Sequence, residues 1–175
     1  MGYIEEYWGI FRKHECKDIL DAGCGTNRFK EYAKDEEVIG MDLNSLKADI
    51  IADIQKLPFK DGSFDGVLCL HVLEHLLYPL TAVKEFHRVL RPGGILIAVC
   101  PTPWVINAWN DPYHVRPHTK RSLETLAKDG GFIHLDSYYN VGGPGFGILR
   151  IYKLRFLSFL PFLRDSAVVV CQKTC

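Results

Sequence analysis

Three aspartates and two glycines form the part of the sequence best suited to binding a ligand. Asp21, Asp42 and Asp53 each end or follow a short apolar run, and Gly23 and Gly25 come directly after the first run. If these runs are parallel strands, their carboxyl ends share the edge of the sheet where open α/β folds bind ligands. Carboxylates there can accept hydrogen bonds from ribose hydroxyls, and glycines let the backbone bend sharply and approach a ligand closely.

The Gly-x-Gly turn is expected to lead from the first strand into a helix. The N-terminus of that helix would offer free N–H groups and positive potential to an anionic group. A dinucleotide fingerprint needs a third glycine, and Asn27 stands in its place. Asp42 lies 21 residues after Asp21, a spacing that suits a ribose-binding carboxylate. The pattern therefore indicates a ribose-containing ligand but gives an incomplete dinucleotide motif.

Alternating strands and helices are expected to position these residues. The clearest helical patterns are 79–90, with Pro79 in its first turn, and 119–128. Short apolar runs predict seven strands, at 18–21, 38–41, 49–52, 66–70, 95–100, 132–138 and 167–171. This alternation predicts an α/β, Rossmann-like, doubly wound and mostly parallel seven-stranded sheet with helices on both faces.

We expect a single domain over residues 1–175, with two unusual segments. The segment 1–15 predicts an N-terminal helix because its aromatic residues recur at helical spacing. Segment 141–164 is an apolar and basic insertion before the last strand, with four basic residues and no acidic ones. Four interpretations of it stay open: a lid over a hydrophobic acceptor, a peripheral membrane contact, a dimer contact, or a buried helix. A membrane or dimer contact would involve residues 147–160.

Composition excludes several classes of protein. The 175 residues include 21 basic and 21 acidic residues, and this zero net charge argues against dedicated nucleic-acid binding. The six cysteines are scattered without a Cys-x-x-Cys pair, which favours buried free thiols over a disulfide or zinc framework. We therefore expect no metal site and a reducing, cytoplasmic location. From its first residues and its apolar runs we also expect no signal peptide and no membrane span.

A series of motifs in a fixed order gives the most specific information. They are Asp21-Ala-Gly-Cys-Gly-Thr, Ile39-Gly-Met-Asp42, Ala52-Asp-Ile-Gln-Lys-Leu-Pro-Phe59, Ser63-Phe-Asp-Gly-Val67, Leu73-Glu-His75 and Arg88-Val-Leu-Arg-Pro-Gly-Gly94. In this order they resemble the signatures of class I S-adenosylmethionine-dependent methyltransferases, most closely the methyltransferase type 11 group. The resemblance covers roughly residues 15–138.

The resemblance implies an S-adenosyl-L-methionine cofactor. Gly23 and Gly25 would lie beside the methionine portion of the cofactor, and Asp42 would bind its ribose diol. Asp53 and Ile54 would contact its adenine. Asn27 is tolerable because this cofactor has no pyrophosphate and asparagine accepts unusual backbone angles. The full set of expected cofactor-binding residues is Asp21, Gly23, Cys24, Gly25, Asp42, Leu43, Asp53, Ile54, Leu70 and His71.

Methyl transfer from a sulfonium mainly requires a nucleophile held in line with the S–CH₃ bond, so no fixed catalytic triad is expected. A general base is needed only if the acceptor must lose a proton, and the candidates are His71, His75 and His114. His71 and His75 could equally be structural, with His75 bonding backbone carbonyls. The long aromatic loop 101–118, which also holds His118, could bind a planar acceptor or simply cover the fifth strand.

The expected function is methyl transfer to a small molecule, with lipophilic and aromatic acceptors as the candidates. Two alternatives are an NAD-dependent Rossmann oxidoreductase and a noncatalytic binding partner with the same fold. Protein methylation stays open. Base methylation is disfavoured because the fourth strand is followed by His71-Val-Leu-Glu74, without the Asn/Asp-Pro-Pro-Tyr/Phe motif of enzymes that methylate amino groups of bases.

Overall fold

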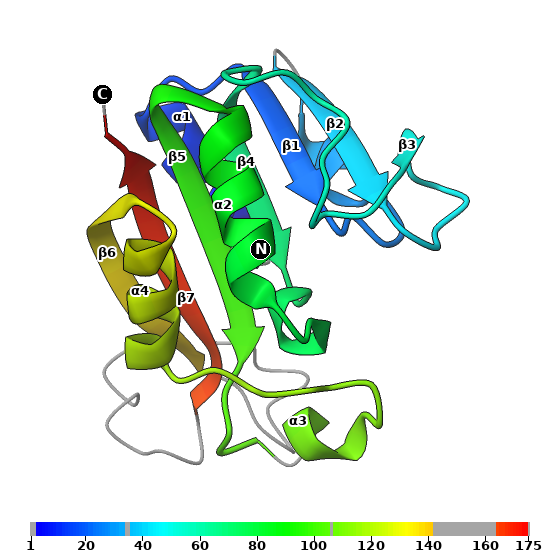
Figure 1. The fold of residues 1–175 in the computed structure, drawn as a ribbon, viewed down its shortest axis with the longest axis vertical. Coiled ribbons are helices and arrows are strands. Elements are labelled where there is room, and N and C mark those ends of the chain that lie inside the picture. Colours follow the sequence, from blue (N-terminus) through cyan, green and yellow to red (C-terminus); the bar gives the residue numbers. More distant parts are fainter. Residues whose placement is uncertain (1–2, 34–35, 106, 142–163, 175) are drawn as a thin grey trace.

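Seven strands form one twisted sheet in the computed structural model, which describes residues 3–33, 36–105, 107–141 and 164–174. The strands are β1 (Asp18–Ala22), β2 (Glu37–Asp42), β3 (Ile50–Ile51), β4 (Phe64–Leu70), β5 (Leu90–Pro101), β6 (Phe132–Val141) and β7 (Arg164–Lys173). Their order is β3-β2-β1-β4-β5-β7-β6, and β7 is antiparallel to both its neighbours (Figure 1). The predicted seven-stranded, mostly parallel sheet is confirmed. β3 is shorter than expected, and β5 to β7 are longer.

Helices cover both faces of the sheet, as predicted. Helices α2 (Pro79–Val89) and α4 (Lys120–Asp129) lie on one face, and α1 (Tyr3–Lys13) lies on the other (Figure 1). The apolar sides of the helices explain this placement, because Val83 and Phe86 of α2 join one buried cluster while Tyr7 and Phe11 of α1 join another. Thr119 caps α4, its hydroxyl accepting a hydrogen bond from the Ser122 N–H at 3.1 Å.

The expected helix after the Gly-x-Gly turn is wrong. The chain forms only a four-residue 3₁₀ helix there, η1 (Phe29–Tyr32), which offers no helix N-terminus to an anion. Gly25 and Asn27 adopt positive φ angles of 51° and 59°, so the turn continues where a helix would begin. Phe29 packs edge-on against Trp8 of α1, with ring centroids 5.2 Å apart. Phe29 thus joins the apolar cluster that α1 buries against the face of the sheet opposite α2 and α4.

Two other expectations concern the chain's surroundings. Most of the predicted insertion 141–164, including 147–160, lies outside the described residues. At its end, the Arg164 guanidinium lies over the rings of Trp104 and Tyr139, 5.1 and 4.7 Å from their centroids.

Within the described ranges, no helix combines the length and apolar character needed to span a membrane. The five cysteines described are free thiols.

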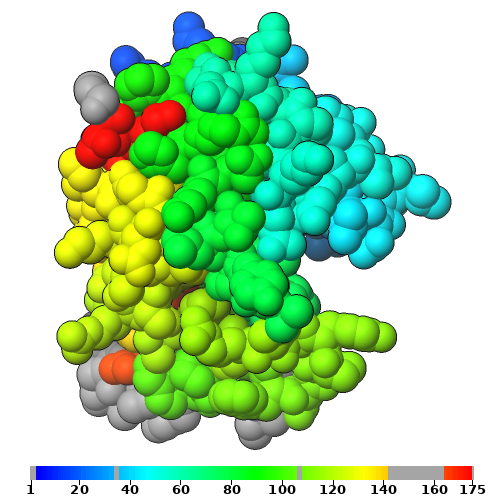
Figure 2. All heavy atoms as spheres, viewed as in Figure 1, coloured from blue at the N-terminus to red at the C-terminus, as the bar shows by residue number. Residues whose placement is uncertain are grey.

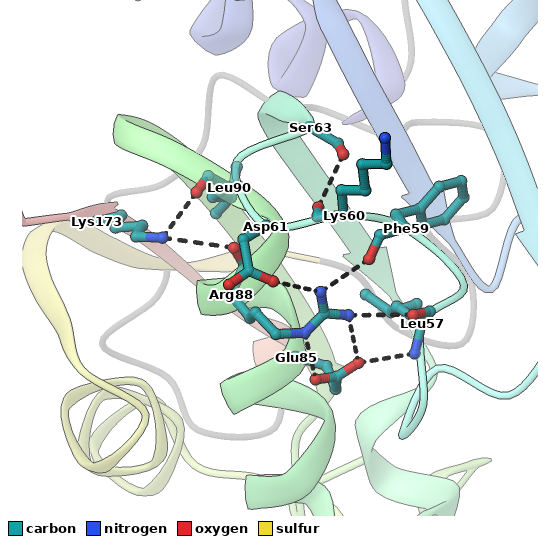
Figure 3. Close-up of polar contacts among 9 residues, drawn as sticks. All are labelled: Leu57, Phe59, Lys60, Asp61, Ser63, Glu85, Arg88, Leu90 and Lys173. Carbon is teal, nitrogen blue, oxygen red and sulfur yellow. Dashed lines mark hydrogen bonds and ion pairs between the residues drawn. The ribbon is translucent and has the colours of Figure 1, made fainter.

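Arg88, in the last turn of α2, fixes the loop between β3 and β4 (Figure 3). Its guanidinium donates two hydrogen bonds of 2.8 Å to Glu85, and others to the carbonyl oxygens of Leu57 and Phe59 and to Asp61. The Leu57 N–H in turn donates to Glu85. Because this loop begins with Asp53 and Ile54, the network sets the position of one wall of the site described next.

Candidate cofactor-binding site

All ten residues expected to bind the cofactor line one cavity of about 810 Å³ at the carboxyl edge of the parallel strands. They are Asp21, Gly23, Cys24, Gly25, Asp42, Leu43, Asp53, Ile54, Leu70 and His71. Figure 2 shows the surface hollowed between the cyan segment after β2 and the yellow-green segment after β5. The topology explains this convergence, because β1, β2 and β4 are neighbours whose chains run in the same direction.

The Gly-x-Gly turn forms the floor of the cavity. The N–H groups of Gly23 and Cys24 donate to the carbonyl oxygen of Met41 on β2, at 2.7 and 3.0 Å. Gly23 has a φ of 87°, and a Cβ there would lie 2.1 Å from Val72 Cγ2, so only glycine fits. At Gly25 the space around a Cβ is empty to 4 Å, which leaves room for a ligand to approach the backbone.

Asp42 is held in place by backbone donors. Its carboxylate accepts hydrogen bonds from the N–H groups of Gly25, Asn44 and Ser45 at 3.0, 2.9 and 3.0 Å. These bonds join the turn after β1 to the turn after β2. The carboxylate therefore stands at the cavity with a fixed orientation, as binding of a ribose diol requires.

Asp21 is the most deeply buried acid of the cavity, with 4% of its surface exposed. Burial, and then the nearby Asp42 carboxylate, raise its pKa to about 7. A carboxyl with this pKa becomes ionised near neutral pH, and a cation placed beside it would favour the ionised form. Burial, followed by the carboxylates of Asp21, Asp42 and Asp49, raises the pKa of the Cys24 thiol to about 11.

The loop after β3 supplies the opposite wall. The Asp53 carboxylate accepts a hydrogen bond from the Gln55 N–H at 2.8 Å and so closes a tight turn, while Ile54 is buried. Leu43, after β2, exposes 58% of its surface within the same cavity. Apolar side chains on either side of a polar turn suit a flat heterocycle with polar edges.

The three candidate catalytic histidines lie close together but differ in position. His71 lines the cavity with a positive φ of 55°, and its Nδ1 lies 3.4 Å from the Glu74 carboxylate. His75 also lines the cavity, and its Nδ1 lies 3.2 Å from the Tyr113 carbonyl oxygen. His114 stands behind His75, with ring centroids 4.6 Å apart, and is not part of the cavity wall. The backbone contact of His75 matches the structural one of the two roles that the sequence left open.

Several residues around the cavity were not expected from the sequence. Arg28, Val72 and Tyr113 line it, and Glu74 is buried beside it. Arg28 has a sequence signal, since it follows the glycine turn directly. Tyr113 belongs to the loop after β5, and only the fold brings it here. The loop's other histidine, His118, is buried against Ser122, 3.4 Å from its hydroxyl oxygen, away from the cavity.

A second cavity of about 460 Å³ adjoins the first. Ile4, Arg28, Leu70 and His71 line both. The described residues that line only the smaller cavity are Tyr3, Tyr7, Glu31, Tyr32, Asn140, Asp165 and Ser166. The larger cavity thus has at its wall a carboxylate held by backbone donors, and the smaller cavity, which three tyrosines line, adjoins it at His71.

Comparison with known proteins agrees with this geometry. Residues 20–98 match the family model described as "Methyltransferase domain". The chain is 43% identical over 107 residues to the uncharacterized protein MJ0638 of Methanocaldococcus jannaschii, covering 55% of this chain and 47% of the relative. It is 31% identical over 156 residues to a probable S-adenosylmethionine-dependent methyltransferase of Mycolicibacterium smegmatis, covering 73% of this chain and 60% of the relative. The chain thus spans about half the length of the curated relatives it matches.

Some relatives have names that state an acceptor. A malonyl-[acyl-carrier protein] O-methyltransferase of Enterobacter lignolyticus is 32% identical over 128 residues, covering 63% of this chain and 51% of the relative. A tRNA U34 carboxymethyltransferase of Nautilia profundicola is 33% identical over 111 residues, covering 51% and 37%. The acceptors of these relatives therefore differ in chemical class.

The fold has close counterparts among solved structures. The crystal structure of a putative methyltransferase from Bacillus halodurans superposes with a TM-score of 0.75 at 17% identity, covering 98% of this chain and all of that one. The shared fold, the motifs in sequence and the matched family model agree. The chain belongs to the class I S-adenosylmethionine-dependent methyltransferases.

Proposed function

We propose that this protein transfers the methyl group of S-adenosylmethionine to a small-molecule acceptor. The observation that carries the proposal is the convergence of the ten expected cofactor residues on one cavity, with Asp42 fixed at its wall by three backbone donors. In this proposal the ribose diol binds Asp42, the adenine lies beside Asp53 and Ile54, and the methionine portion passes Gly23 and Gly25. The cationic sulfonium and ammonium groups favour ionised Asp21 nearby.

The smaller cavity is the proposed acceptor site. It adjoins the cofactor cavity along His71 and Leu70, so an acceptor there would face the methyl group without contacting the adenine end. Three tyrosines line it, and tyrosine rings favour a planar acceptor because they stack and also offer a hydroxyl. We therefore propose a planar, aromatic small molecule, rather than a nucleic acid or a protein, as the acceptor.

His71 is the proposed general base where the acceptor must lose a proton. It is the only one of the three candidate histidines that lines both cavities. Its side chain is 45% exposed, and the Glu74 carboxylate lies 3.4 Å from its Nδ1, so a protonated imidazole would have a stabilising partner. The transfer itself is an in-line displacement: the acceptor's electron pair forms the new bond to carbon while the C–S bond breaks, leaving S-adenosylhomocysteine.

Equilibrium binding tests the proposal most directly. Isothermal titration should show S-adenosylhomocysteine binding to the wild type. Asp42→Ala should weaken that binding by about 1–3 kcal/mol, because charge-assisted bonds to the ribose are lost. Asp49→Ala is a matched control, since Asp49 bonds Lys30 and the Gly40 N–H outside the cavity. NADH binding without S-adenosylhomocysteine binding would instead support a dinucleotide oxidoreductase and reject the proposal.

A screen for S-adenosylhomocysteine release identifies the acceptor class. Purified protein is incubated with the cofactor and with aromatic metabolites, acyl-carrier protein, a peptide pool or tRNA in separate reactions. Release only with aromatic metabolites supports the proposed acceptor class. Release with tRNA or acyl-carrier protein, the acceptors named for two relatives, would overturn that part of the proposal. Release in no reaction, with the cofactor bound, would favour the noncatalytic alternative.

We also propose a reducing, cytoplasmic location. Cys69, Cys100 and Cys171 are buried free thiols within strands of the sheet, where they act as small apolar side chains. Thiol titration in denaturant of protein isolated without reductant should find them reduced.

A further inference from the structure

Glu74 has a buried carboxylate without an evident structural role. The residue is 1% exposed, and neither carboxylate oxygen accepts a hydrogen bond from any residue in the described ranges. Its backbone does the structural work, because the Glu74 carbonyl oxygen accepts from the N–H groups of Val115 and Arg116 at 2.8 and 3.1 Å. These two bonds hold the loop after β5 in place. His71 Nδ1 lies 3.4 Å from Oε1 of this carboxylate, while Oε2 has no hydrogen-bond partner in the described ranges. Burying a carboxylate oxygen without a partner is costly, so Oε2 can take a ligand that the protein chain does not supply.

Two imidazoles beside this carboxylate are in the tautomer that binds metal ions. The Nδ1 atoms of His75 and His114 lie 3.2 and 2.8 Å from the carbonyl oxygens of Tyr113 and Ala108. A carbonyl oxygen can only accept a hydrogen bond, so each Nδ1 carries the proton and each Nε2 keeps its lone pair. A backbone carbonyl that fixes the second ring nitrogen in this way is the usual outer partner of a metal-bound histidine.

The three side chains converge. One ligand atom from each of Glu74, His75 and His114 lies within 4.8 Å of the other two. With metal–ligand bonds of about 2.0–2.2 Å, ligand atoms in a tetrahedral site lie about 3.4 Å apart, so a shift of about 1 Å would close the site. Asp111, 3.7 Å from His114 Nε2, adds negative charge at the rim.

We propose that Glu74, His75 and His114 bind one divalent transition-metal ion, of which Zn²⁺ is the best match. Two imidazole nitrogens and one carboxylate form a ligand set that Zn²⁺ takes at sites with an open fourth position. His75 lines the cofactor cavity, so that position would be reachable from it. The proposal revises the expectation from the sequence that the chain has no metal site.

Cysteine ligation at this place is disfavoured by the same surroundings. Cys69 and Cys100 are fully buried within β4 and β5, and neither sulfur belongs to the group of ligand atoms formed by Glu74, His75 and His114. The proposed site therefore has nitrogen and oxygen ligands only, and this property can be observed directly.

A metal ion here would also serve the chemistry proposed above. Zn²⁺ lowers the pKa of a bound hydroxyl group, so an acceptor that extends from the smaller cavity into the cofactor cavity and places its hydroxyl at the open position would lose its proton to water near neutral pH. This role rests on the proposed methyl transfer, but metal binding does not. The two are therefore tested separately, and the metal experiment uses neither cofactor nor acceptor.

The experiment titrates untagged, chelator-treated protein with Zn²⁺ by calorimetry and with Co²⁺ by absorption spectroscopy. The wild type should bind one ion per chain, and the Co²⁺ spectrum should show d–d bands without a thiolate charge-transfer band. Glu74→Gln and His114→Ala should each weaken Zn²⁺ binding by at least about 10–100-fold, the loss seen when even an outer partner is removed. His134→Ala is the control, because His134 is an exposed residue of β6 whose nearest acid is Glu124.

Three results would overturn the proposal: no stoichiometric binding to the wild type, equal binding by both site variants, or a thiolate band with Co²⁺. Glu74→Gln keeps the shape of the side chain and removes only its charge, so the variant should fold. Circular dichroism checks this for each variant. If one variant does not fold, the other decides the outcome, since the two substitutions lie on different segments of the chain.

Discussion

The edge of the sheet that bears the cofactor cavity has two halves, one after β1 to β3 and one after β4 and β5, and their polar groups are bonded in different ways. In the first half, the carboxylates of Asp42 and Asp53 accept hydrogen bonds from nearby backbone N–H groups, three of them at Asp42. Asp21 is the exception among the acids of this half. Behind β4 and β5, the Glu74 carboxylate has no hydrogen bond within the described chain, and His71 is held at a positive φ angle. The carboxylates of the first half are thus held in position without a ligand, whereas the Glu74 carboxylate of the second half can still accept bonds from one.

Under the proposed function, this difference separates recognition of the cofactor from the chemistry of the acceptor. A fixed set of donors and acceptors suits one constant ligand, so we expect the acids after β1 to β3 to bind the cofactor. Histidines and a buried carboxylate suit proton transfer or metal binding, which depend on the acceptor. Substitutions in the first half should therefore change cofactor affinity and stability, and those in the second half should change turnover.

The largest expected effect is on turnover, at His71. His71→Asn keeps the left-handed backbone conformation, which asparagine accepts, and removes the imidazole. If the acceptor must lose a proton, kcat should fall about 10²–10⁴-fold while S-adenosylhomocysteine affinity stays within about threefold. Steady-state kinetics with calorimetry measures both. Equal losses in affinity and kcat would place His71 with the cofactor residues and erase the contrast between the halves.

The next effect is the pH dependence that Asp21 gives to stability. Its pKa is about 7 in the folded protein against an ordinary value of 3.8, so the folded state binds more protons than the unfolded state between these values. The contribution of Asp21 is thus fully present below about pH 4 and is lost as pH rises through 7. At 1.36 kcal/mol per pKa unit, the loss is at most about 4 kcal/mol.

Asp21→Asn isolates this contribution. Urea unfolding at pH 5 and pH 8 should show the variant gaining stability relative to the wild type as pH rises. The other shifted acids, such as Asp65 with its lowered pKa, are common to both proteins and cancel. Cofactor affinity should fall in the variant at pH 8, because the variant lacks the ionised carboxylate that would lie near the cationic groups of the cofactor. A variant that tracks the wild type at every pH would mean that Asp21 does not titrate in this range.

Stability effects within the glycine turn should be smaller and should differ between its two glycines. Gly23→Ala places a Cβ 2.1 Å from Val72 at a φ of 87°, which should cost about 2–4 kcal/mol from backbone strain and overpacking. Gly25→Ala meets nothing within 4 Å and should cost only about 1–2 kcal/mol of strain, but it would narrow the cavity. Chemical denaturation measures the stability of each variant, and titration with S-adenosylhomocysteine measures whether its cavity has been narrowed. Equal destabilisation by both would contradict the geometry of the turn.

Much of the first half could be predicted from the sequence, for a physical reason. Asp42 and Asp53 follow strands that lie side by side and run in the same direction, so their order along the chain gives their order along the sheet edge. The helix expected after Gly25 was wrong because the turn continues through Asn27, whose side chain donates to the Lys47 carbonyl oxygen at 3.0 Å. Local pattern does not show that Phe29, after this turn, packs with the aromatic residues of the N-terminal helix.

The second half could be predicted only in part. His71 and His75 follow a recognisable strand, and both line the cavity as expected. The grouping of Glu74 with His114 depends on how the loop after β5 folds back, because 39 residues separate the two in the chain. The loop is fixed by backbone hydrogen bonds to Glu74, and such bonds have no signature in residue type. The sequence therefore predicts the proposed cofactor residues better than the residues that would distinguish this protein from its relatives.

The smallest expected effect tests how the two halves are connected. Arg88 lies on α2, the helix that follows His71 and His75, and it holds the loop that contains Asp53. Arg91 is the control, because it donates hydrogen bonds to Asp18 and Asp65 away from the cavity. Lysine cannot reproduce the forked hydrogen bonds of arginine, so Arg88→Lys and Arg91→Lys should each lower stability by about 1 kcal/mol. Only Arg88→Lys should also weaken S-adenosylhomocysteine binding, by a few fold, because only its loop forms a cavity wall. If Arg91→Lys weakens binding equally, the loss reflects general loosening of the sheet, and the Arg88 network would not link the helix to the cofactor site.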